Sequence, residues 1–189
     1  SVSDPDNNLG LVSFLINDSL VSELSSAPFE LTLEDLGSGN KRLVVQAVDA
    51  QGQYAYDSIE FVLNAPPFVE FSEPSQDTVV SDGDDVWIRL EALDTDGTVA
   101  TVSVFIDSVL VSTMHDGPWN HLIENIPYGM HSISAVVTDN LGLQSLASIE
   151  IVANATSEIS ITAPLQNQIY PVGDRVEARV AVTDPDNNL

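Results

Sequence analysis

Aspartates spaced two residues apart recur at three places in the chain, and this spacing on a turn could bind a cation. The pairs are Asp4 and Asp6, Asp94 and Asp96, and Asp184 and Asp186. Two further aspartates, Asp49 and Asp139, open the turns "DAQG" and "DNLG". Carboxylates on one turn, joined by an aspartate and backbone carbonyls from other segments, supply the hard oxygen ligands that Ca²⁺ prefers. These eight aspartates are therefore candidate calcium ligands, and Ca²⁺ is the only cofactor that the sequence suggests.

The same acidic segments have a second interpretation as turns. In "DPDNNL" and "DTDG", aspartate and asparagine can hydrogen-bond to their own backbone, and glycine allows positive φ. No stretch of the chain matches the EF-hand loop, which would make a calcium assignment specific. Calcium binding and turn formation therefore both stay open at these positions.

Other residues with catalytic potential lack the spacing that catalysis or zinc binding needs. His115, His121 and His131 do not form a metal-ligand motif, and no G-x-S-x-G nucleophile elbow occurs. The chain has no cysteine, which excludes disulfides, zinc–thiolate sites and cysteine nucleophiles. We therefore expect that the protein is not an enzyme.

The charge of the chain is strongly negative, with 29 Asp and Glu residues against 5 Lys and Arg residues. Such a surface repels nucleic acids and anionic membranes. No apolar run approaches the roughly 18 residues that a bilayer-spanning segment needs. We therefore expect neither a nucleic-acid partner nor insertion into a membrane.

The chain repeats itself with a period of 90 residues. When each residue is aligned with the one 90 positions later, 27 of the 99 pairs are identical and no gap is needed. For example, "SIEFVLNA" at 58–65 aligns with "SIEIVANA" at 148–155. The two ends are also alike, since "SVSDPDNNL" at 1–9 and "AVTDPDNNL" at 181–189 share 7 of 9 residues. This pattern predicts tandem domains of one fold.

The middle copy, residues 65–154, reads as short strands separated by turns. In "VWIRLEAL" at 86–93, the apolar residues Val86, Ile88 and Leu90 lie on one face of the expected strand and the residues between them lie on the other. This alternation is typical of a half-buried strand. The expected strands lie at 68–72, 86–93, 99–107, 109–114, 118–126, 131–139 and 146–153. Seven strands in about 90 residues, without helical periodicity, predict an all-β antiparallel sandwich.

The middle copy contains a series of motifs in the segment "DTDGTVATVSVFIDSVLVST…GPW…IPYGMHSISAVVTDNLG". The series begins with D-x-D-G and a strand, continues with a Gly-His turn, and closes with a strand that ends in Asp before x-x-G. This pattern resembles the bacterial immunoglobulin-like (Ig-like) repeats of surface adhesins, extracellular fibres and the accessory regions of secreted enzymes. The resemblance implies tandem seven-strand Ig-like sandwiches and an extracellular or cell-surface location. A similarity to cadherins implies calcium at the domain junctions. The first copy departs from the pattern, because Lys41 stands where the turn would place His.

If the seven strands are labelled A to G, the segments of the chain hold different parts of the fold. Residues 1–64 are expected to hold strands C to G of an incomplete domain, and residues 65–154 a complete domain. Residues 155–189 are expected to hold strands A and B of a third copy, at 158–164 and 175–183. Those two strands are expected to complete a neighbouring 1–64 segment. The neighbour is either another copy of the chain, joined head to tail, or another part of a longer array.

The predicted function is structural: a repeat unit of an extracellular filament or adhesin stalk, whose partners are copies of itself. The alternative is a carbohydrate-binding accessory module of a secreted enzyme. Such a module needs exposed aromatic side chains, and the sequence offers Trp87, Tyr54 and Tyr56. Trp119 and Phe29, which share one repeat position, are expected to be core anchors.

Overall fold

The computed structural model describes residues 4–5 and 8–186, and strands are the only regular secondary structure in that part of the chain. The chain divides into two compact units. The first unit contains the residues up to Pro66 together with Asp94–Thr98, and the second contains Pro67–Leu93 and the residues from Val99 onward. Within the described residues, no helix is long and apolar enough to span a bilayer.

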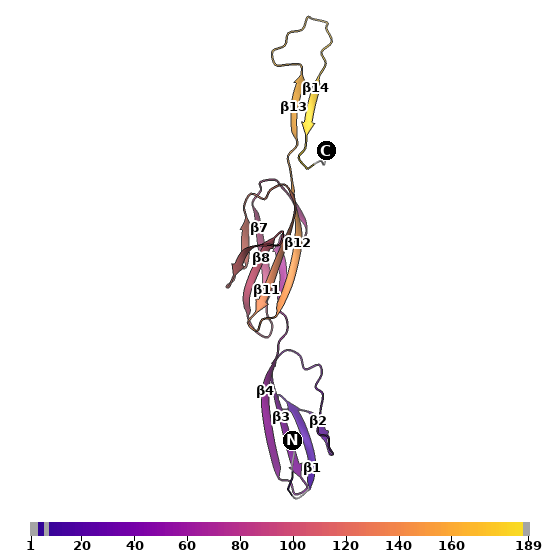
Figure 1. The fold of residues 1–189 in the computed structure, drawn as a ribbon, viewed down its shortest axis with the longest axis vertical. Helices are drawn as coiled ribbons and strands as arrows, with labels where there is room; N and C mark the ends of the chain where they lie inside the picture. The colour runs from indigo at the N-terminus through magenta and orange to yellow at the C-terminus, as the bar shows by residue number, and fades with distance from the viewer. Residues whose placement is uncertain (1–3, 6–7, 187–189) are drawn as a thin grey trace. The chain divides into compact units, whose positions relative to one another are not determined.

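The first unit is built around a four-stranded antiparallel sheet with the order β2-β1-β3-β4 (Figure 1). The strands are β1 (Leu9–Ile16), β2 (Ser19–Leu24), β3 (Gly39–Asp49) and β4 (Tyr54–Leu63). Asn17 and Asp18 connect β1 to β2 with φ angles of 47° and 65°. Asparagine and aspartate tolerate this left-handed region, so the turn is short enough to pair the two strands directly.

The second unit contains a sandwich of two sheets. One sheet has the order β10-β7-β5 and the other has the order β6-β12-β11-β8-β9. The strands are β5 (Phe68–Glu73), β6 (Thr78–Ser81), β7 (Val86–Leu93), β8 (Val99–Ile106), β9 (Val109–Met114), β10 (Asn120–Ile123), β11 (Gly129–Asp139) and β12 (Gln144–Asn154). The expected all-β sandwich is therefore confirmed.

The core of the sandwich lies between these two sheets. On β7, Val86, Ile88 and Leu90 are buried while Trp87 and Arg89 are exposed, as their alternation predicts. Side chains of β8, β11 and β12 pack against them from the opposite sheet, among them Val102, Val104, Ile133, Ala135, Val137, Ile149 and Ile151. Trp119 is a half-buried member of the same cluster, which agrees with its expected role as a core anchor.

Three strands differ from the sequence expectation. The sequence analysis missed β6, a four-residue strand that pairs in parallel with the edge of β12. The first unit was expected to hold a strand near residues 30–33, but residues 28–36 are irregular. In the second unit the equivalent segment is β10, which pairs with β7. Among the described residues of the first unit, no strand equivalent to β7 is present to pair with residues 30–33. The last strand is shorter than the expected 175–183 and covers only Arg179–Thr183.

The segment after β12 forms an antiparallel hairpin of β13 (Glu158–Ala163) and β14 (Arg179–Thr183), drawn as the last two arrows in Figure 1. This hairpin is a two-stranded sheet of its own. A two-stranded sheet without a packed face is marginally stable in water. Its apolar residues therefore need a partner surface.

Candidate functional site

The first unit has an apolar groove on one face of its four-stranded sheet. The groove has a volume of about 480 Å³. It is lined mainly by side chains of β1, β3 and β4, together with Phe29: Val12, Phe14, Leu43, Val45, Ala47, Ala55, Tyr56, Asp57, Ser58 and Ile59. We call this surface the open groove. Phe29 therefore lines a groove in the first unit, whereas its counterpart Trp119 packs against a closed core.

The open groove corresponds to a buried surface in the second unit. Ile59 is 58% exposed, whereas Ile149, its counterpart 90 residues later, is 7% exposed. Val45 is half-buried, whereas its counterpart Ala135 is fully buried. In the second unit this surface is covered by β5 and β7. The difference in burial therefore matches the lack of a second sheet on the groove.

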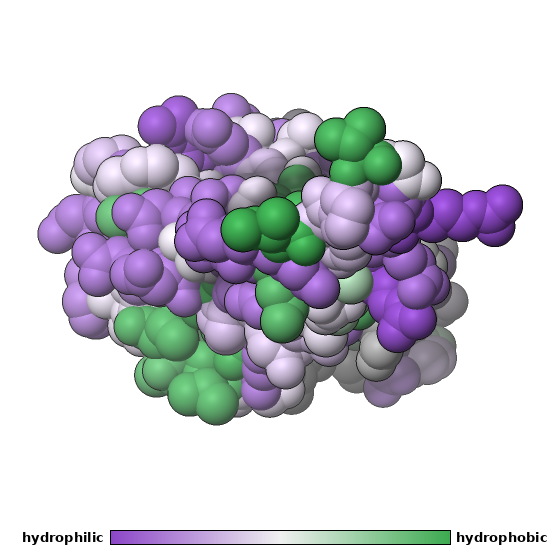
Figure 2. All heavy atoms as spheres, turned by 90° about the horizontal axis from the view of Figure 1, so that it is seen from above, coloured by the Kyte–Doolittle hydropathy of each residue, from purple (hydrophilic) through white to green (hydrophobic). Residues whose placement is uncertain are grey.

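The hairpin of β13 and β14 carries the reverse feature, an apolar face without a sheet to cover it. Its exposed apolar residues include Ile159, Ile161, Val176, Val180 and Val182. We call this set the hairpin face. Ile159 and Ile161 are 72% and 73% exposed, whereas their counterparts Val69 and Phe71 are 8% and 7% exposed. Figure 2 shows hydrophobic side chains reaching the surface beside hydrophilic ones on the face that it draws.

The hairpin has the same strand register as β5 and β7 of the sandwich. Glu158 pairs with Thr183, as Phe68 pairs with Leu93. Both pairs of strands also have an irregularity at the same position, between residues 161 and 163 and between residues 71 and 73. Side-chain direction along a strand follows from register. The hairpin face therefore has the arrangement that β5 and β7 use to cover their own core.

The acidic loop Asp94–Thr98 is hydrogen-bonded to the segment that follows β4, within the first unit. The backbone N–H of Ala65 donates to Oδ2 of Asp96 at 3.1 Å, and the N–H of Asp96 donates to Oδ1 of Asp94 at 3.3 Å. Asp94 is only 8% exposed. Among the described residues, Oδ2 of Asp94 and Oδ1 of Asp96 are buried and accept no hydrogen bond. Each carboxylate thus has one oxygen on the backbone and a second oxygen available to a ligand.

The same contacts recur 90 residues later in the second unit. The N–H of Ala155 donates to Oδ2 of Asp186 at 2.9 Å, and the N–H of Asp186 donates to Oδ1 of Asp184 at 3.4 Å. The hydroxyl of Ser157 donates to Oδ2 of Asp184 at 3.1 Å. A hydrogen bond with the side chain of Asp186 raises the pKa of Asp184 above its usual value. The neighbouring carboxyl group of Asp186 thus favours the protonated form of Asp184.

The other candidate aspartates act in turns. Oδ1 of Asp139 accepts the N–H groups of Leu141 and Leu143, and Oδ1 of Asp49 accepts the N–H groups of Gln51 and Gln53. Turn formation therefore accounts for one oxygen of each carboxylate. Oδ2 of Asp4 accepts the N–H of Asn8 at 3.0 Å, while Asp6 lies outside the described residues. No group of three or more His, Cys, Asp or Glu side chains that could hold a metal ion is present in the described part of the chain.

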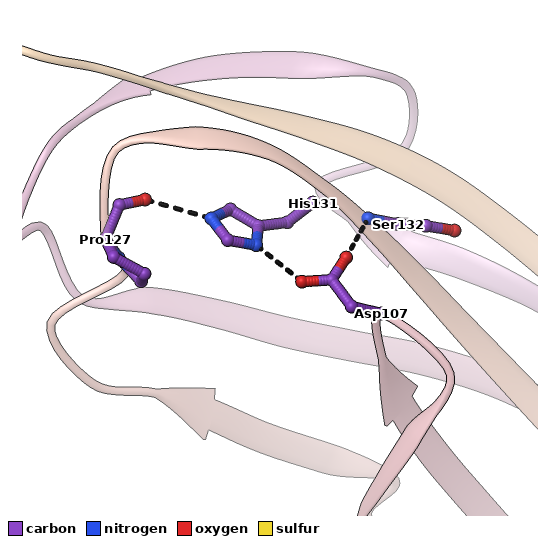
Figure 3. Close-up of polar contacts among 4 residues, drawn as sticks. All are labelled: Asp107, Pro127, His131 and Ser132. Carbon is purple, nitrogen blue, oxygen red and sulfur yellow. Dashed lines mark hydrogen bonds and ion pairs between the residues drawn. The ribbon is translucent and has the colours of Figure 1, made fainter. Parts of the chain in front are cut away.

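His131 forms a polar contact that the sequence analysis did not identify (Figure 3). Its Nδ1 lies 2.8 Å from Oδ2 of Asp107 and its Nε2 lies 2.9 Å from the carbonyl oxygen of Pro127. Oδ1 of Asp107 also accepts the N–H of Ser132 at 2.9 Å. Because both ring nitrogens face oxygen acceptors, the doubly protonated ring fits best. The hydrogen bond between the two side chains raises the pKa of His131 and lowers the pKa of Asp107.

The aromatic residues considered for sugar binding are exposed but belong to different units. Tyr54 and Tyr56 lie on β4 of the first unit, and Trp87 lies on β7 of the second. Tyr56 lines the open groove, whose other lining residues are mainly aliphatic. Phe14 and Phe29 are its other aromatic lining residues, and neither was among the three candidates for sugar binding.

The comparison with protein families agrees with the sandwich of the second unit. Residues 67–135 match the family described as bacterial Ig domain. Fibronectin(III)-like modules of Clostridium thermocellum CbhA are similar at 20% identity, covering 90% of this chain and 87% of theirs, with a TM-score of 0.45. The N-terminal eight Ig domains of Down Syndrome Cell Adhesion Molecule are similar at 12% identity, covering 92% and 27%, with a TM-score of 0.43. The central fibronectin-III array of RIM-binding protein has 16% identity, covering 87% and 67%, with a TM-score of 0.31. No curated protein matches the sequence.

Proposed function

We propose, from the bacterial Ig-like character of residues 67–135, that this chain is a structural repeat unit of an extracellular filament or adhesin stalk. Bacterial Ig-like domains are typically extracellular or surface modules without catalytic activity. In this role the sandwiches act as spacers, and their function lies in their number, stability and connection. Strands equivalent to β13 and β14 complete the sandwich of the first unit by adding a second sheet over its open groove. They come either from another copy, head to tail, or from a neighbouring part of a longer array.

One observation carries the proposal: the open groove and the hairpin face are the two halves of the interface that is closed in the sandwich. Val45 and Ile59 line the groove, while Ile161 and Val180 lie on the hairpin. Their counterparts in the second unit are all buried in one core. Large apolar surfaces and unpaired strand edges favour association in proteins that expose them.

The carbohydrate-binding alternative has less support. Its three candidate aromatics are divided between two units, and the open groove is lined mainly by aliphatic side chains. Sugar sites instead combine aromatic faces with several polar groups that fix orientation. Binding of the purified chain to a glycan array, reduced by Tyr56→Ala, would support this alternative over a purely structural role.

A rearranged chain tests whether a hairpin of strands A and B completes the sandwich of the first unit. In this chain, residues 155–189 precede residues 10–154, so that "DPDNNL" occurs once and each domain has all its strands. We expect the first-domain transition to rise by more than about 10 °C, since each kcal/mol of added stability shifts the midpoint of a small domain by about 4–8 °C. The comparison is made with residues 1–189 at a dilution where that chain is monomeric.

The control is the same rearranged chain with Val180→Asp, which places a carboxylate on the hairpin face. This variant should lose the added stability and the slowed amide exchange of Leu43, Val45 and Ala47 on β3. If the rearranged chain protects these amides no better than residues 1–189 do, the proposed completion is wrong in both its forms.

We also propose that Ca²⁺ binds at the acidic loops, as a second feature of the same array. The supporting observation is the buried Oδ2 of Asp94, which accepts no hydrogen bond from the described residues, beside the buried Oδ1 of Asp96. Buried carboxylates are costly when no charge or donor compensates them. A calcium ion would compensate both, with carbonyl and water oxygens completing its six to eight ligands.

The calcium proposal is tested by melting in Ca²⁺ and in chelator, followed through the loss of tryptophan fluorescence. We expect a higher midpoint in Ca²⁺, with a smaller effect of Mg²⁺ because it demands a tighter octahedral site. Asp94→Asn should abolish the Ca²⁺ effect, while Glu91→Gln, on an exposed residue of β7, should leave it unchanged. Identical midpoints in Ca²⁺ and chelator would mean that the loops are turns only.

A further inference from the structure

We propose that the hairpin of β13 and β14 in one copy of this chain docks into the open groove of a second copy, and that residues 30–33 of the second copy then form a strand beside residues 176–179, the segment that leads into β14. This inference rests on the proposed function and adds the identity of the partner, the register of the interface and a segment that folds on binding. It treats the open groove and the hairpin face as one heterologous contact. Such a contact leaves a free groove at one end and a free hairpin at the other.

The register of the interface follows from the sandwich of the second unit. There, β10 pairs with β7 through Asn120 and Arg89, His121 and Ile88, Leu122 and Trp87, and Ile123 and Val86. The residues 90 positions away are Glu30 and Arg179, Leu31 and Ala178, Thr32 and Glu177, and Leu33 and Val176. Residues 30–33 are irregular, and no described strand of the first unit pairs with them. Residues 176–178, just before β14, are irregular too, so on docking the two segments would form strands together and supply each other's backbone donors and acceptors.

The side chains of residues 30–33 are suited to this register. Leu31 and Leu33 occupy the inward positions, where they would lie opposite Ala178 and Val176, and both are only half-buried now. Glu30 would lie opposite Arg179, so the pair carries opposite charges. In the second unit the same position pairs Asn120 with Arg89 and has no such attraction. Opposite charges directly across two strands stabilise pairing.

The charge of the chain predicts how the association depends on salt. Two copies that each carry a formal net charge of −24 repel each other at low ionic strength. The proposed contact is mainly apolar, and burial of apolar surface is not weakened by screening. Association should therefore strengthen as NaCl rises from 20 to 500 mM, whereas an interface held by ion pairs would weaken.

Cysteine cross-linking of the full chain tests the partner and the register together, because the sequence has no native cysteine. The test chain carries Thr32→Cys and Glu177→Cys, at positions expected to lie opposite each other. Directly opposite residues are about 4.5–5.5 Å apart between Cα atoms, which suits a disulfide. We expect oxidation to give a ladder of dimers, trimers and longer species on a non-reducing gel.

The matched control carries Thr32→Cys and Ala181→Cys. Ala181, in β14, lies four residues after Glu177, about 13 Å away at the rise of a strand, and should give at least tenfold less cross-linked product. Equal cross-linking of both pairs would contradict the register. A disulfide confined to monomers would show that the hairpin folds back on its own chain, and an absence of disulfides would show that no second copy binds. Either result overturns the inference.

A complementary mixture tests the head-to-tail contact without cysteines. Val180→Asp damages only the hairpin face, and Val45→Asp damages only the open groove. Each variant should sediment as a monomer, whereas an equimolar mixture should form a heterodimer that grows no further. Ala181→Asp, on the outer face of β14, should polymerise like the unaltered chain. Unchanged tryptophan fluorescence verifies that the second unit of each variant is folded, and unchanged far-ultraviolet circular dichroism verifies that the strands of both units are retained.

These outcomes separate the inference from the proposed function. If the rearranged chain is stabilised but residues 1–189 stay monomeric at about 100 μM and high salt, the groove is completed by a neighbouring part of a longer chain. The proposed function then stands and the second-copy inference fails. If the rearranged chain gains no stability, both fail.

Discussion

The sheet of the first unit and its counterpart in the second unit use related sequences and have different surroundings. In both units a strand with alternating apolar residues pairs with its neighbours in the same order, as β1 and β3 do in the first and β8 and β11 do in the second. In the second unit β5 and β7 cover the apolar face, and among the described residues of the first unit no strand does. Within a sheet, the local sequence is sufficient for pairing. Burial depends on a partner strand that is distant in sequence.

The hairpin extends this comparison, because it repeats the covering strands without a sheet to cover. Its register matches that of β5 and β7, so pairing between two strands does not require the core. Its apolar residues are exposed, while the same positions in the sandwich are buried. The difference implies that identical truncations should have very different effects in the two places.

The largest contrast is expected for truncations at equivalent positions on β7 and β14. Leu90 is 6% exposed and Val180 is 57% exposed. Leu90→Ala should destabilise the second unit by about 2–5 kcal/mol, because it removes a buried side chain and leaves a cavity. Val180→Ala should change the stability of the same unit by less than about 0.5 kcal/mol. Urea denaturation followed by tryptophan fluorescence measures this, since Trp87 and Trp119 both lie in the sandwich.

The effect of Val180→Ala at different protein concentrations provides the control for this contrast between β7 and β14. If the hairpin docks in a second copy, Val180→Ala should become destabilising for the first unit at protein concentrations where the chain associates. A loss of more than about 1 kcal/mol from the second unit at high dilution would mean that the hairpin already packs on the sandwich, contrary to its exposure.

A smaller contrast is expected for the turn aspartates Asp139 and Asp49. Each accepts two backbone N–H groups through Oδ1, but Asp139 is 2% exposed and Asp49 is half-buried. Loss of an acceptor costs about 1–3 kcal/mol when the donors are left buried, and less when water can replace it. Asp139→Ala should therefore destabilise the second unit by about 1–3 kcal/mol, and Asp49→Ala should destabilise the first by less.

Asparagine at either position sharpens this test, because Asp→Asn keeps an oxygen that can accept both N–H groups. Asp139→Asn should retain most of the stability that Asp139→Ala loses, as measured by thermal melting of each unit. If alanine and asparagine are equally damaging at residue 139, the negative charge matters more than the turn, which would favour the calcium interpretation of this loop.

Much of the sandwich could be predicted from the sequence because its strands alternate strictly. The burial of Val86, Ile88 and Leu90 follows from period-two patterning, and the repeat fixed where their counterparts should lie. In contrast, β6 is a four-residue edge strand with only two half-buried side chains, so its pattern is too short to recognise. The irregular segment 28–36 could not be predicted locally, because its strand depends on hydrogen bonds from a distant strand.

The candidate site was predictable only in part, for a similar reason. The spacing of Asp94 and Asp96 indicated a loop with ligand character, whereas the hydrogen bond from Ala65 to Asp96 could be found only in the structure. The contact between Asp107 and His131 joins residues 24 positions apart, and only the fold shows that their side chains meet. An aspartate in the turn after β8 and a histidine early in β11 were the only signals in the sequence.

The smallest contrast concerns the turn between β8 and β9 and its counterpart between β1 and β2. In the second unit Asp107 binds His131, while in the first unit Asn17 and Lys41 occupy the same positions. Oδ1 of Asn17 accepts the N–H of Arg42 at 2.9 Å, just as Oδ1 of Asp107 accepts the N–H of Ser132, so the backbone contact is retained. Only the second unit adds a titratable pair, and only its stability should therefore vary with pH near neutrality.

The sign of this pH dependence follows from the two pKa shifts. The pKa of His131 is raised in the folded state, so its contribution is complete below about pH 6.5, the unfolded value, and is lost as pH rises through the folded pKa. The pKa of Asp107 is lowered, so its contribution is present above about pH 4 and is lost as pH falls through its folded pKa. The pair should therefore stabilise the second unit most between about pH 4 and 6.5, by about 0.2–1 kcal/mol because Asp107 is exposed.

Melting of the second unit at pH 5.5 and pH 8.5, followed by tryptophan fluorescence, measures this contribution. Asp107→Asn restores the pairing chemistry of the first unit, since asparagine still accepts the N–H of Ser132 but carries no charge for His131. It should remove most of the difference between the two pH values and leave the stability at pH 8.5 nearly unchanged. An equal loss at both pH values would mean that Asp107 acts through the backbone turn alone, and the two units would then be equivalent at this position.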